Sequence, residues 1–363
     1  MRIALVVTGG VDSSAREKVI PSLLSLVERL ARQHELHVFA LRYLAAPTTY
    51  PLLGATVHDL GSPRGIARQY LALRSAMARA GRFDIIHGYW ALPAGLVSVL
   101  VGRRLGVPSV VTFDSGEFVG IPDIHYGAQT SWRQRLAVRA SARLATRSLV
   151  CTRYQQSLGQ ELGVTAAVIP LGADPRWLSP PERRIEGPPW RLLHVGSINP
   201  VKDHNTLLRA FEILIARGVD ASLDIVGEDT MHGTAKELAS RLGLEARVTF
   251  HGARQHDQLQ AFYHRAHLFV LSSRHEAAGM VVLEAALCGL PVVGSAVGYI
   301  ADWAPERAAG VPPHDPEALA SAIATLLADH ERRQTMAEAA FAWAGQHDAD
   351  RTARELLQVY SAL

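Results

Sequence analysis

Short runs of β-branched and apolar residues alternate with longer amphipathic stretches along the whole chain. This alternation is typical of a parallel sheet covered by helices, because two parallel strands need a connection long enough to hold a helix. The expected strands of the first half are Arg2–Val7, Leu36–Leu41, Thr56–Asp59, Ile85–His87, Ser109–Phe113, Leu149–Cys151 and Ala167–Ile169. The amphipathic stretches between them are Ser14–Gln33, Arg64–Arg79, Pro93–Leu105 and Trp132–Leu144. The pattern predicts an α/β protein with doubly wound sheets.

A second series of the same kind follows a segment rich in proline and charge, residues 179–189. Its expected strands are Arg191–Val195, Ser222–Val226, Arg247–Phe250, Leu268–Leu271 and Pro291–Gly294. The length of 363 residues also exceeds what one hydrophobic core usually organises. We therefore expect a first domain over residues 1–180, a second over 181–345, and a C-terminal helix over 346–363 that packs back on the first domain.

Composition narrows the class of protein. Hydrophobic residues make up 48% of the chain and charged residues 20%, and no apolar run approaches the roughly 18 residues of a membrane span. The first ten residues resemble a buried strand and a glycine turn rather than a secretory leader, so we expect a cytoplasmic protein.

The two cysteines, Cys151 and Cys288, are too few for a disulfide framework or a structural zinc site. A net charge of +3 does not indicate a nucleic-acid partner, but it suits small anions or an acidic membrane surface.

Residues that directly follow strands are the first candidates for a site. In open α/β sheets, ligands bind at the carboxyl ends of the strands, and two such domains side by side would place these ends at the cleft between them.

The most informative segment runs from Ser272 to Val293, after the strand Leu268–Leu271. A loop containing Glu276 leads to Gly279, where a helix is expected to begin, and Glu284 lies one or two turns into that helix. The free N–H groups at such a helix start bind phosphate without a metal. Two glutamates at this spacing would otherwise be ordinary solvated helix positions, but the turn at Gly279 between them and the stop at Gly289 favour a site.

This segment resembles the signature of retaining glycosyltransferase family 4, also described as glycosyltransferase group 1. The resemblance covers nearly the whole chain, closely from Arg191 to Ser295 and loosely before it. It implies the GT-B architecture of two Rossmann-like domains facing a cleft. It assigns Glu276 to the donor sugar, as a catalytic residue, and Glu284 to the ribose hydroxyls. The helix start at Gly279, Met280 and Val281 then belongs to the donor site.

A second match is the run from His194 to Asp203, a strand followed by a glycine loop. The resemblance places Lys202 against the leaving diphosphate, as a catalytic and donor-binding residue beside Gly196 and Ser197. The family commonly has an arginine directly after this glycine, so Ser197 removes one expected cation. Arg254 or Arg274 is a candidate to replace it.

Weaker matches extend the donor site. Gly252 follows a strand at the place where the family passes the nucleotide base, and Gly9 and Gly10 follow the first strand. Glycine turns of this kind are common after any strand. On the acceptor side we place His87 and Glu117, with a strand-capping role as the equal alternative for His87.

Asp114 stands where the family typically carries a histidine close to the reacting sugar. An ionised aspartate cannot donate a hydrogen bond, but it can accept from sugar hydroxyls and can stabilise a developing oxocarbenium charge. We expect Asp114 to be catalytic in this way. A base-catalysed, inverting reaction with Asp114 as the base stays open.

Two other patterns receive less functional weight. Asp348 and Asp350 imitate the Asp-x-Asp element of metal-dependent glycosyltransferases, but they precede a helix and are better interpreted as helix-capping acids. We therefore expect no metal site and no cofactor. Arg135, Arg139 and Arg143 form, with Arg147, a basic stripe beside Trp132. Such a stripe is usually a solvated face, and contact with the inner membrane surface is the functional alternative.

The expected activity is transfer of a sugar from a nucleotide diphosphate sugar to an acceptor hydroxyl, with retention and without metal. The acceptor is a saccharide, a lipid-linked molecule or a small molecule, and nucleic acid is not a partner. A nucleotide-sugar epimerase, a phosphorylase-like enzyme and an inactive sugar-nucleotide-binding protein are the alternatives. The oligomeric state is left open.

Overall fold

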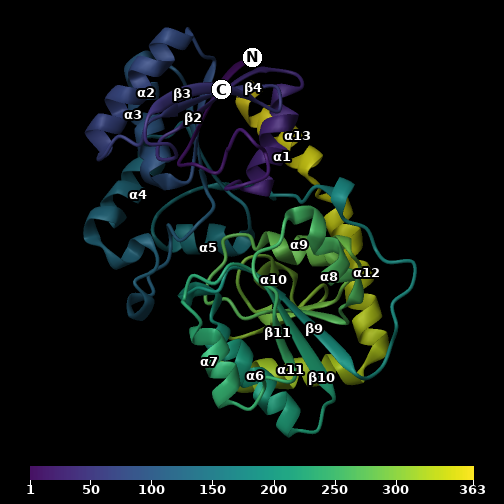
Figure 1. The fold of residues 1–363 in the computed structure, drawn as a ribbon. Coiled ribbons are helices and arrows are strands. Elements are labelled where there is room, and N and C mark those ends of the chain that lie inside the picture. The colour runs from purple at the N-terminus through teal and green to yellow at the C-terminus, as the bar shows by residue number, and fades with distance from the viewer. The chain divides into compact units, whose positions relative to one another are not determined.

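The computed structural model describes residues 1–363, which form two compact units. The first unit contains residues 1–171 and 349–363, and the second contains residues 172–348 (Figure 1). The boundary between the units lies between Leu171 and Gly172. It comes before the proline-rich segment, residues 179–189, where the sequence predicted the boundary. The chain contains no helix of the length and apolar character that a membrane crossing requires.

The first unit is built on an eight-stranded sheet with the order β3-β4-β2-β1-β5-β6-β7-β8. Neighbouring strands are parallel except β3 and β4, which form an antiparallel hairpin. The strands are β1 (Arg2–Val7), β2 (Glu35–Ala40), β3 (Pro47–Leu52), β4 (Ala55–Leu60), β5 (Ile85–Tyr89), β6 (Ser109–Phe113), β7 (Arg147–Val150) and β8 (Ala167–Val168). β1, β5 and β6 are almost fully buried because helices cover both faces of the sheet.

Helices from both ends of the chain cover one face of this sheet. Side chains of α1 (Pro21–Ala31) and α13 (Ala349–Ser361) share a buried core with β1, β2 and β4, and Figure 1 shows α13 beside α1. The opposite face packs against α2 (Ile66–Ala80), α3 (Leu96–Leu105), α4 (Trp132–Leu144) and α5 (Arg153–Glu161). Single helical turns lie at Ala91–Gly95, Pro122–Ile124 and Ala128–Thr130.

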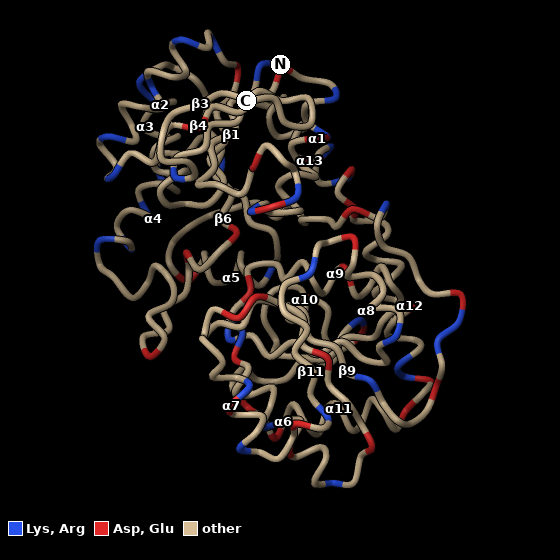
Figure 2. The backbone as a smooth tube through the Cα atoms, viewed as in Figure 1, with Lys and Arg blue, Asp and Glu red and all other residues tan.

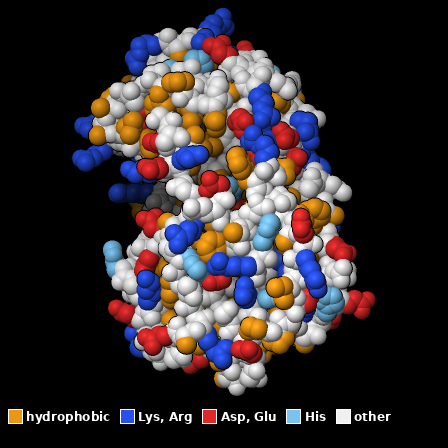
Figure 3. Space-filling view, turned by 45° about the vertical axis from the view of Figure 1, so that its right-hand side comes forward, with side chains coloured by type: hydrophobic (Ala, Val, Ile, Leu, Met, Phe, Trp, Pro, Cys, Tyr) orange, Lys and Arg blue, Asp and Glu red, His pale blue; other side chains and the backbone are white.

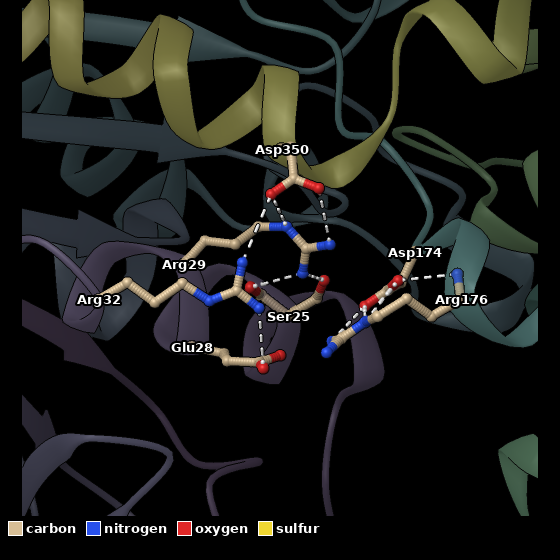
Figure 4. A network of polar contacts seen from close by, with 7 residues as sticks. All are labelled: Ser25, Glu28, Arg29, Arg32, Asp174, Arg176 and Asp350. Atoms are coloured by element: carbon tan, nitrogen blue, oxygen red, sulfur yellow. Dashed lines mark hydrogen bonds and ion pairs between the residues drawn. The ribbon is translucent and has the colours of Figure 1, made fainter.

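Polar contacts fix α13 to the first unit. The guanidinium of Arg29, which is 4% exposed, donates to both carboxylate oxygens of Asp350 over 2.9 and 3.2 Å. The Thr352 hydroxyl donates to the Pro170 carbonyl over 2.7 Å. Figure 4 shows Asp350 pointing from α13 towards the arginines of α1. Asp350 is thus an ion-pair partner in this structure.

The second unit has an entirely parallel six-stranded sheet with the order β11-β10-β9-β12-β13-β14. Its strands are β9 (Trp190–Val195), β10 (Ala221–Val226), β11 (Val248–Phe250), β12 (Leu268–Leu271), β13 (Val292–Ser295) and β14 (Ala309–Val311). Its helices are α6 (His204–Ala216), α7 (Thr234–Arg241), α8 (Leu259–Arg265), α9 (Met280–Leu287), α10 (Tyr299–Trp303), α11 (Pro316–Ala328) and α12 (His330–Gln346). Single turns lie at Pro175–Trp177, Pro200–Lys202 and His256–Gln258. Two parallel α/β sheets confirm the predicted fold class.

Three elements differ from the sequence pattern. β3 was not predicted, because it contains Pro47 and Pro51 and proline is rare in strands. Proline is tolerated here because β3 lies at the edge of the sheet, where proline removes no ladder hydrogen bond. β14 is only three residues long and was also missed. The first helix begins at Pro21 rather than Ser14, since proline suits the first helical position.

Candidate functional site

Lys202 and Glu276 form an ion pair at the carboxyl ends of neighbouring strands of the second unit. Lys202 ends the helical turn that follows β9, and Glu276 lies in the loop between β12 and α9. The Asn199 side chain accepts from the Lys202 backbone N–H over 3.0 Å, and the Ser272 hydroxyl donates to the Lys202 carbonyl over 2.8 Å. These hydrogen bonds fix the backbone of the turn, so the lysine side chain is directed at the loop before α9.

The Glu276 carboxylate is kept ionised by its surroundings. Burial by itself raises the pKa of Glu276, but the Lys202 ammonium and hydrogen bonds from Lys202 and Ser273 outweigh it and hold the pKa below its usual value. The Ser273 hydroxyl donates to Glu276 over 2.6 Å. A positive and a negative group thus face each other with little exposed surface, where charge interactions are stronger than in water.

The helix that follows begins at the predicted glycine. Gly279 has a φ of 84°, which is accessible to glycine at no steric cost, and it caps α9. Met280 and Val281 of the first turn are partly exposed. The first N–H groups of a helix have no partner within it and carry the positive end of the helix dipole. The start of α9 can therefore bind an anionic group.

Glu284 lies in the second turn of α9 and is almost buried. The Tyr263 hydroxyl donates to one carboxylate oxygen over 2.7 Å, and the His256 ring nitrogen Nδ1 lies 3.8 Å from the other. Tyr263 therefore orients the carboxylate, whose remaining lone pairs can accept from a diol. Sequence reasoning missed Tyr263 and His256, because no local spacing connects them to Glu284.

Three glycine loops after β9, β10 and β11 pack directly on one another. The Gly227 N–H donates to the Gly252 carbonyl over 3.0 Å, and a Cβ on Gly227 would lie 2.0 Å from the Gly196 carbonyl oxygen. No side chain fits at position 227, so backbone lines this edge. Ser197 is partly exposed at this edge and Gly252 is exposed. A role in donor binding stays a prediction for both residues.

Two buried histidines lie behind Lys202, and sequence reasoning gave them no role. The rings of His194 and His204 meet edge to face with centroids 4.7 Å apart. His194 contacts the Val270 carbonyl through Nδ1 over 2.9 Å, while its Nε2 and both nitrogens of His204 have no hydrogen-bond partner. Burial lowers the pKa of His194 to about 4 and that of His204 to about 2. Both rings are thus neutral near pH 7.

In the first unit, Asp114 directly follows β6 and is partly buried. The Tyr89 hydroxyl donates to its Oδ2 over 3.3 Å. The pKa of the Cys151 thiol is well above its usual value, first through burial and then through the Asp114 carboxylate. Asp114 therefore places a carboxyl group at the end of β6, and its part in catalysis stays a prediction.

Glu117 and His87 have mainly internal partners. The buried Glu117 carboxylate accepts from the backbone N–H groups of Ala91 and Ser115 over 3.1 and 2.7 Å, and burial raises its pKa. His87 is fully buried, with ring nitrogens 2.5 and 2.8 Å from the hydroxyls of Tyr360 and Thr112. His87 lies in the middle of β5, so it does not cap the strand, and both of its ring nitrogens already have partners within the first unit.

Gly9 and Gly10 lie in the partly buried turn after β1. Gly10 has a φ of 83°, and a Cβ there would meet the Ile20 side chain at 2.7 Å. The turn therefore has a structural requirement for glycine, and close approach of a ligand stays a prediction. No group of three or more histidine, cysteine, aspartate or glutamate side chains is placed to hold a metal ion.

Two α/β units built on mainly parallel sheets, with an ion pair and a helix start at the strand ends of the second, have the arrangement expected of a GT-B glycosyltransferase. Residues 175–343 match the family model described as glycosyl transferases group 1, and residues 19–172 match the glycosyl transferase 4-like domain. The chain belongs to the group 1 glycosyltransferase family, and it is a glycosyltransferase enzyme.

Named relatives agree with this assignment. D-inositol 3-phosphate glycosyltransferase of Salinispora tropica is 30% identical over 339 residues, covering 85% of this chain and 70% of that protein. The enzyme of the same name from Segniliparus rotundus is 29% identical over 351 residues, covering 87% and 77%.

Solved structures share the fold. Sucrose-phosphate synthase from Thermosynechococcus elongatus superposes with a TM-score of 0.82 at 20% identity, over 100% of this chain and 99% of that one. Anabaena HepE in complex with UDP gives 0.77 at 18% identity, over 100% of both chains.

Proposed function

We propose that the chain transfers a sugar from a nucleoside diphosphate sugar to an acceptor hydroxyl, with retention of configuration and without metal or cofactor. The observation that carries the proposal is the Lys202–Glu276 pair beside the start of α9. A departing diphosphate needs positive charge in a fixed position, and the lysine and the helix dipole supply it. The structures of HepE with UDP and with UDP-glucose make a uridine nucleotide the first donor to test.

The reaction follows from these groups. Lys202 leaves Glu276 to bind the diphosphate oxygens, and the freed Glu276 carboxylate accepts hydrogen bonds from the donor sugar. The acceptor hydroxyl attacks the anomeric carbon on the face from which the diphosphate departs, and a diphosphate oxygen takes its proton. Asp114 stabilises the positive charge that develops on the sugar, and Glu284 holds the ribose hydroxyls.

The acceptor is proposed to be a small hydroxylated molecule that carries a negative charge. The relatives named D-inositol 3-phosphate glycosyltransferases make a phosphorylated polyol the first acceptor to test, with saccharides and lipid-linked acceptors next. We also propose a cytoplasmic location with peripheral contact to the inner membrane face, supported by the exposed arginines of α4.

The test is incubation with UDP-, GDP- and ADP-sugars, with each acceptor class and with excess chelator, and detection of the released nucleoside diphosphate. We expect release that depends on the acceptor, persists in chelator and gives a product with the anomeric configuration of the donor by NMR. An inverted product would overturn retention, and activity restored only by manganese or magnesium would overturn metal independence. Release without transfer, or exchange with inorganic phosphate, would favour an epimerase or a phosphorylase.

A further inference from the structure

Three neighbouring helices of the first unit carry arginine and no acidic residue. α2 has three arginines, α3 has two and α4 has four, and none of the three helices contains aspartate or glutamate. All nine arginines are exposed: Arg68, Arg74, Arg79, Arg103, Arg104, Arg133, Arg135, Arg139 and Arg143. Figure 2 shows basic segments along these helices. In a chain whose net charge is only +3, this is a strong local concentration of positive charge.

These arginines are not neutralised within the unit. The arginines of this unit that form ion pairs lie elsewhere, at Arg2, Arg29, Arg32 and Arg351. α3 packs against both α2 and α4, so the three helices form one layer over the same face of the sheet. We call this layer the arginine face. Its charge is available to an anionic partner.

Large apolar side chains are exposed on the same helices. Four of the ten exposed large hydrophobic residues of the chain lie here: Leu71 (54% exposed), Leu105 (43%), Trp132 (61%) and Leu136 (55%). The Arg133 guanidinium lies 5.4 Å from the Trp132 ring. Figure 3 shows hydrophobic and basic side chains side by side on the first unit. Exposed apolar residues among arginines indicate a binding surface rather than a merely solvated one.

A shallow depression of about 860 Å³ lies between α2 and α3. Five apolar or aromatic residues and two arginines line it: Ile66, Ala67, Tyr70, Leu71, Leu100, Arg103 and Arg104. Apolar residues beside cations are the chemistry that an acyl chain with an anionic headgroup needs.

We infer that the arginine face docks on an anionic lipid bilayer, which specifies the surface for the peripheral contact included in the proposed function. A bilayer fits both features at once, because arginines attract acidic headgroups while tryptophan and leucine enter the boundary between headgroups and acyl chains. A nucleic acid would use the charge but leave Leu71, Leu105 and Leu136 without a partner. The attraction acts between exposed charges, so salt should screen it.

The experiment is co-sedimentation of the full chain with vesicles of phosphatidylcholine alone and of phosphatidylcholine with about 30% phosphatidylglycerol, whose negative surface potential attracts basic side chains. Three variants are compared with the wild type. The first replaces Arg135, Arg139 and Arg143 by Gln, and the second replaces Trp132 and Leu136 by Ser. The control replaces Arg183, Arg209 and Arg241 of the second unit by Gln, removing the same charge from exposed positions elsewhere.

Binding is expected only to the acidic vesicles and should weaken at higher salt. Each arginine-face variant should lose at least tenfold in affinity, while the control and Lys202→Ala bind as the wild type does. Retained folding of each variant is checked by its thermal transition. Equal loss in the control, equal binding to neutral vesicles, or binding to RNA with no vesicle binding would overturn the inference. Vesicle binding by an inactive Lys202→Ala variant separates this surface from the catalytic proposal.

Discussion

Lys202 is the residue whose environment most directly expresses the proposed chemistry. Lys202→Ala should lower kcat/KM at least tenfold, equivalent to about 1.4 kcal/mol of transition-state stabilisation, because the leaving diphosphate loses its cation. Lys236→Ala is the control, since Lys236 is an exposed lysine of the same unit. Steady-state kinetics with varied donor would show the difference. Unchanged kinetics in Lys202→Ala would exclude contact with the diphosphate.

Asp114 is predicted to act through its charge rather than its shape. Asp114→Asn keeps the size and one acceptor oxygen, so donor KM should change less than kcat, and the product should keep its anomeric configuration. Asp220→Asn, at an exposed carboxylate paired with Arg247, serves as the control. NMR of the product and initial rates provide the measurement. Undiminished turnover would move the search for the key residue of the first unit to Glu117.

His204 offers a test of stability at a single residue. Both of its nitrogens are buried without a partner, and an unsatisfied buried polar group costs about 1–3 kcal/mol. His204→Leu should therefore stabilise the second unit by about 1 kcal/mol, or raise its Tm by about 2–4 °C. Calorimetry measures this. A lower Tm would show that the ring has a partner in solution, such as a buried water.

Some site residues can be found from local sequence and others cannot, and the difference has a physical cause. Lys202, and Glu276 with Gly279, lie in two short strand-and-loop segments, and the resemblance of these segments to the family's motifs is what assigned their roles. Tyr263 and the His194–His204 pair depend on packing between elements far apart in the sequence. No spacing rule contains that information, so only the structure supplied it.

At the scale of elements, α13 owes its position to contacts with both α1 and the sheet. Asp350→Asn removes the negative charge and one of the two acceptor oxygens that face the buried Arg29 guanidinium. We expect the first unit to lose about 1–2 kcal/mol of stability, less than for a fully buried pair because Asp350 is 42% exposed. Glu355→Gln, in a partly exposed pair with Arg351 four residues away on the same helix, should cost at most about 0.5 kcal/mol. Urea unfolding compares them, and equal losses would refute a special role for Asp350.

Element prediction succeeded where sequence and burial agree. β1, β5 and β6 are buried apolar runs and were found nearly at their bounds. β3 was missed because its prolines contradict strand propensity, and only its edge position permits them.

At the scale of the whole molecule, three buried histidines couple stability to pH. Burial lowers the pKa of His87 to about 3, of His194 to about 4 and of His204 to about 2, while the unfolded value is about 6.5. The unfolded chain therefore binds more protons below pH 6.5, so the free energy of unfolding falls as the pH drops towards the folded-state values. The slope approaches about 1.4 kcal/mol per pH unit for each histidine.

Urea titrations at pH 7, 6 and 5 would show this loss, and His204→Leu should make the curve shallower. If the two curves kept the same slope, His204 would not be neutral in the folded protein. The second unit contains two of the three histidines, so its transition should shift more than that of the first.

The placement of α13 has a consequence for synthesis. The first unit needs residues 349–363, which the ribosome adds only after the entire second unit. At 5–20 residues per second, roughly 9 to 35 s separate Leu171 from Ala349. During this interval the apolar surface of α1 and its neighbouring strands lacks the helix that will cover it. A nascent chain stopped after Asp348 would contain all residues of the second unit but would lack the last helix of the first. Chaperones and proteases would therefore have access to the first unit, although it was synthesised first.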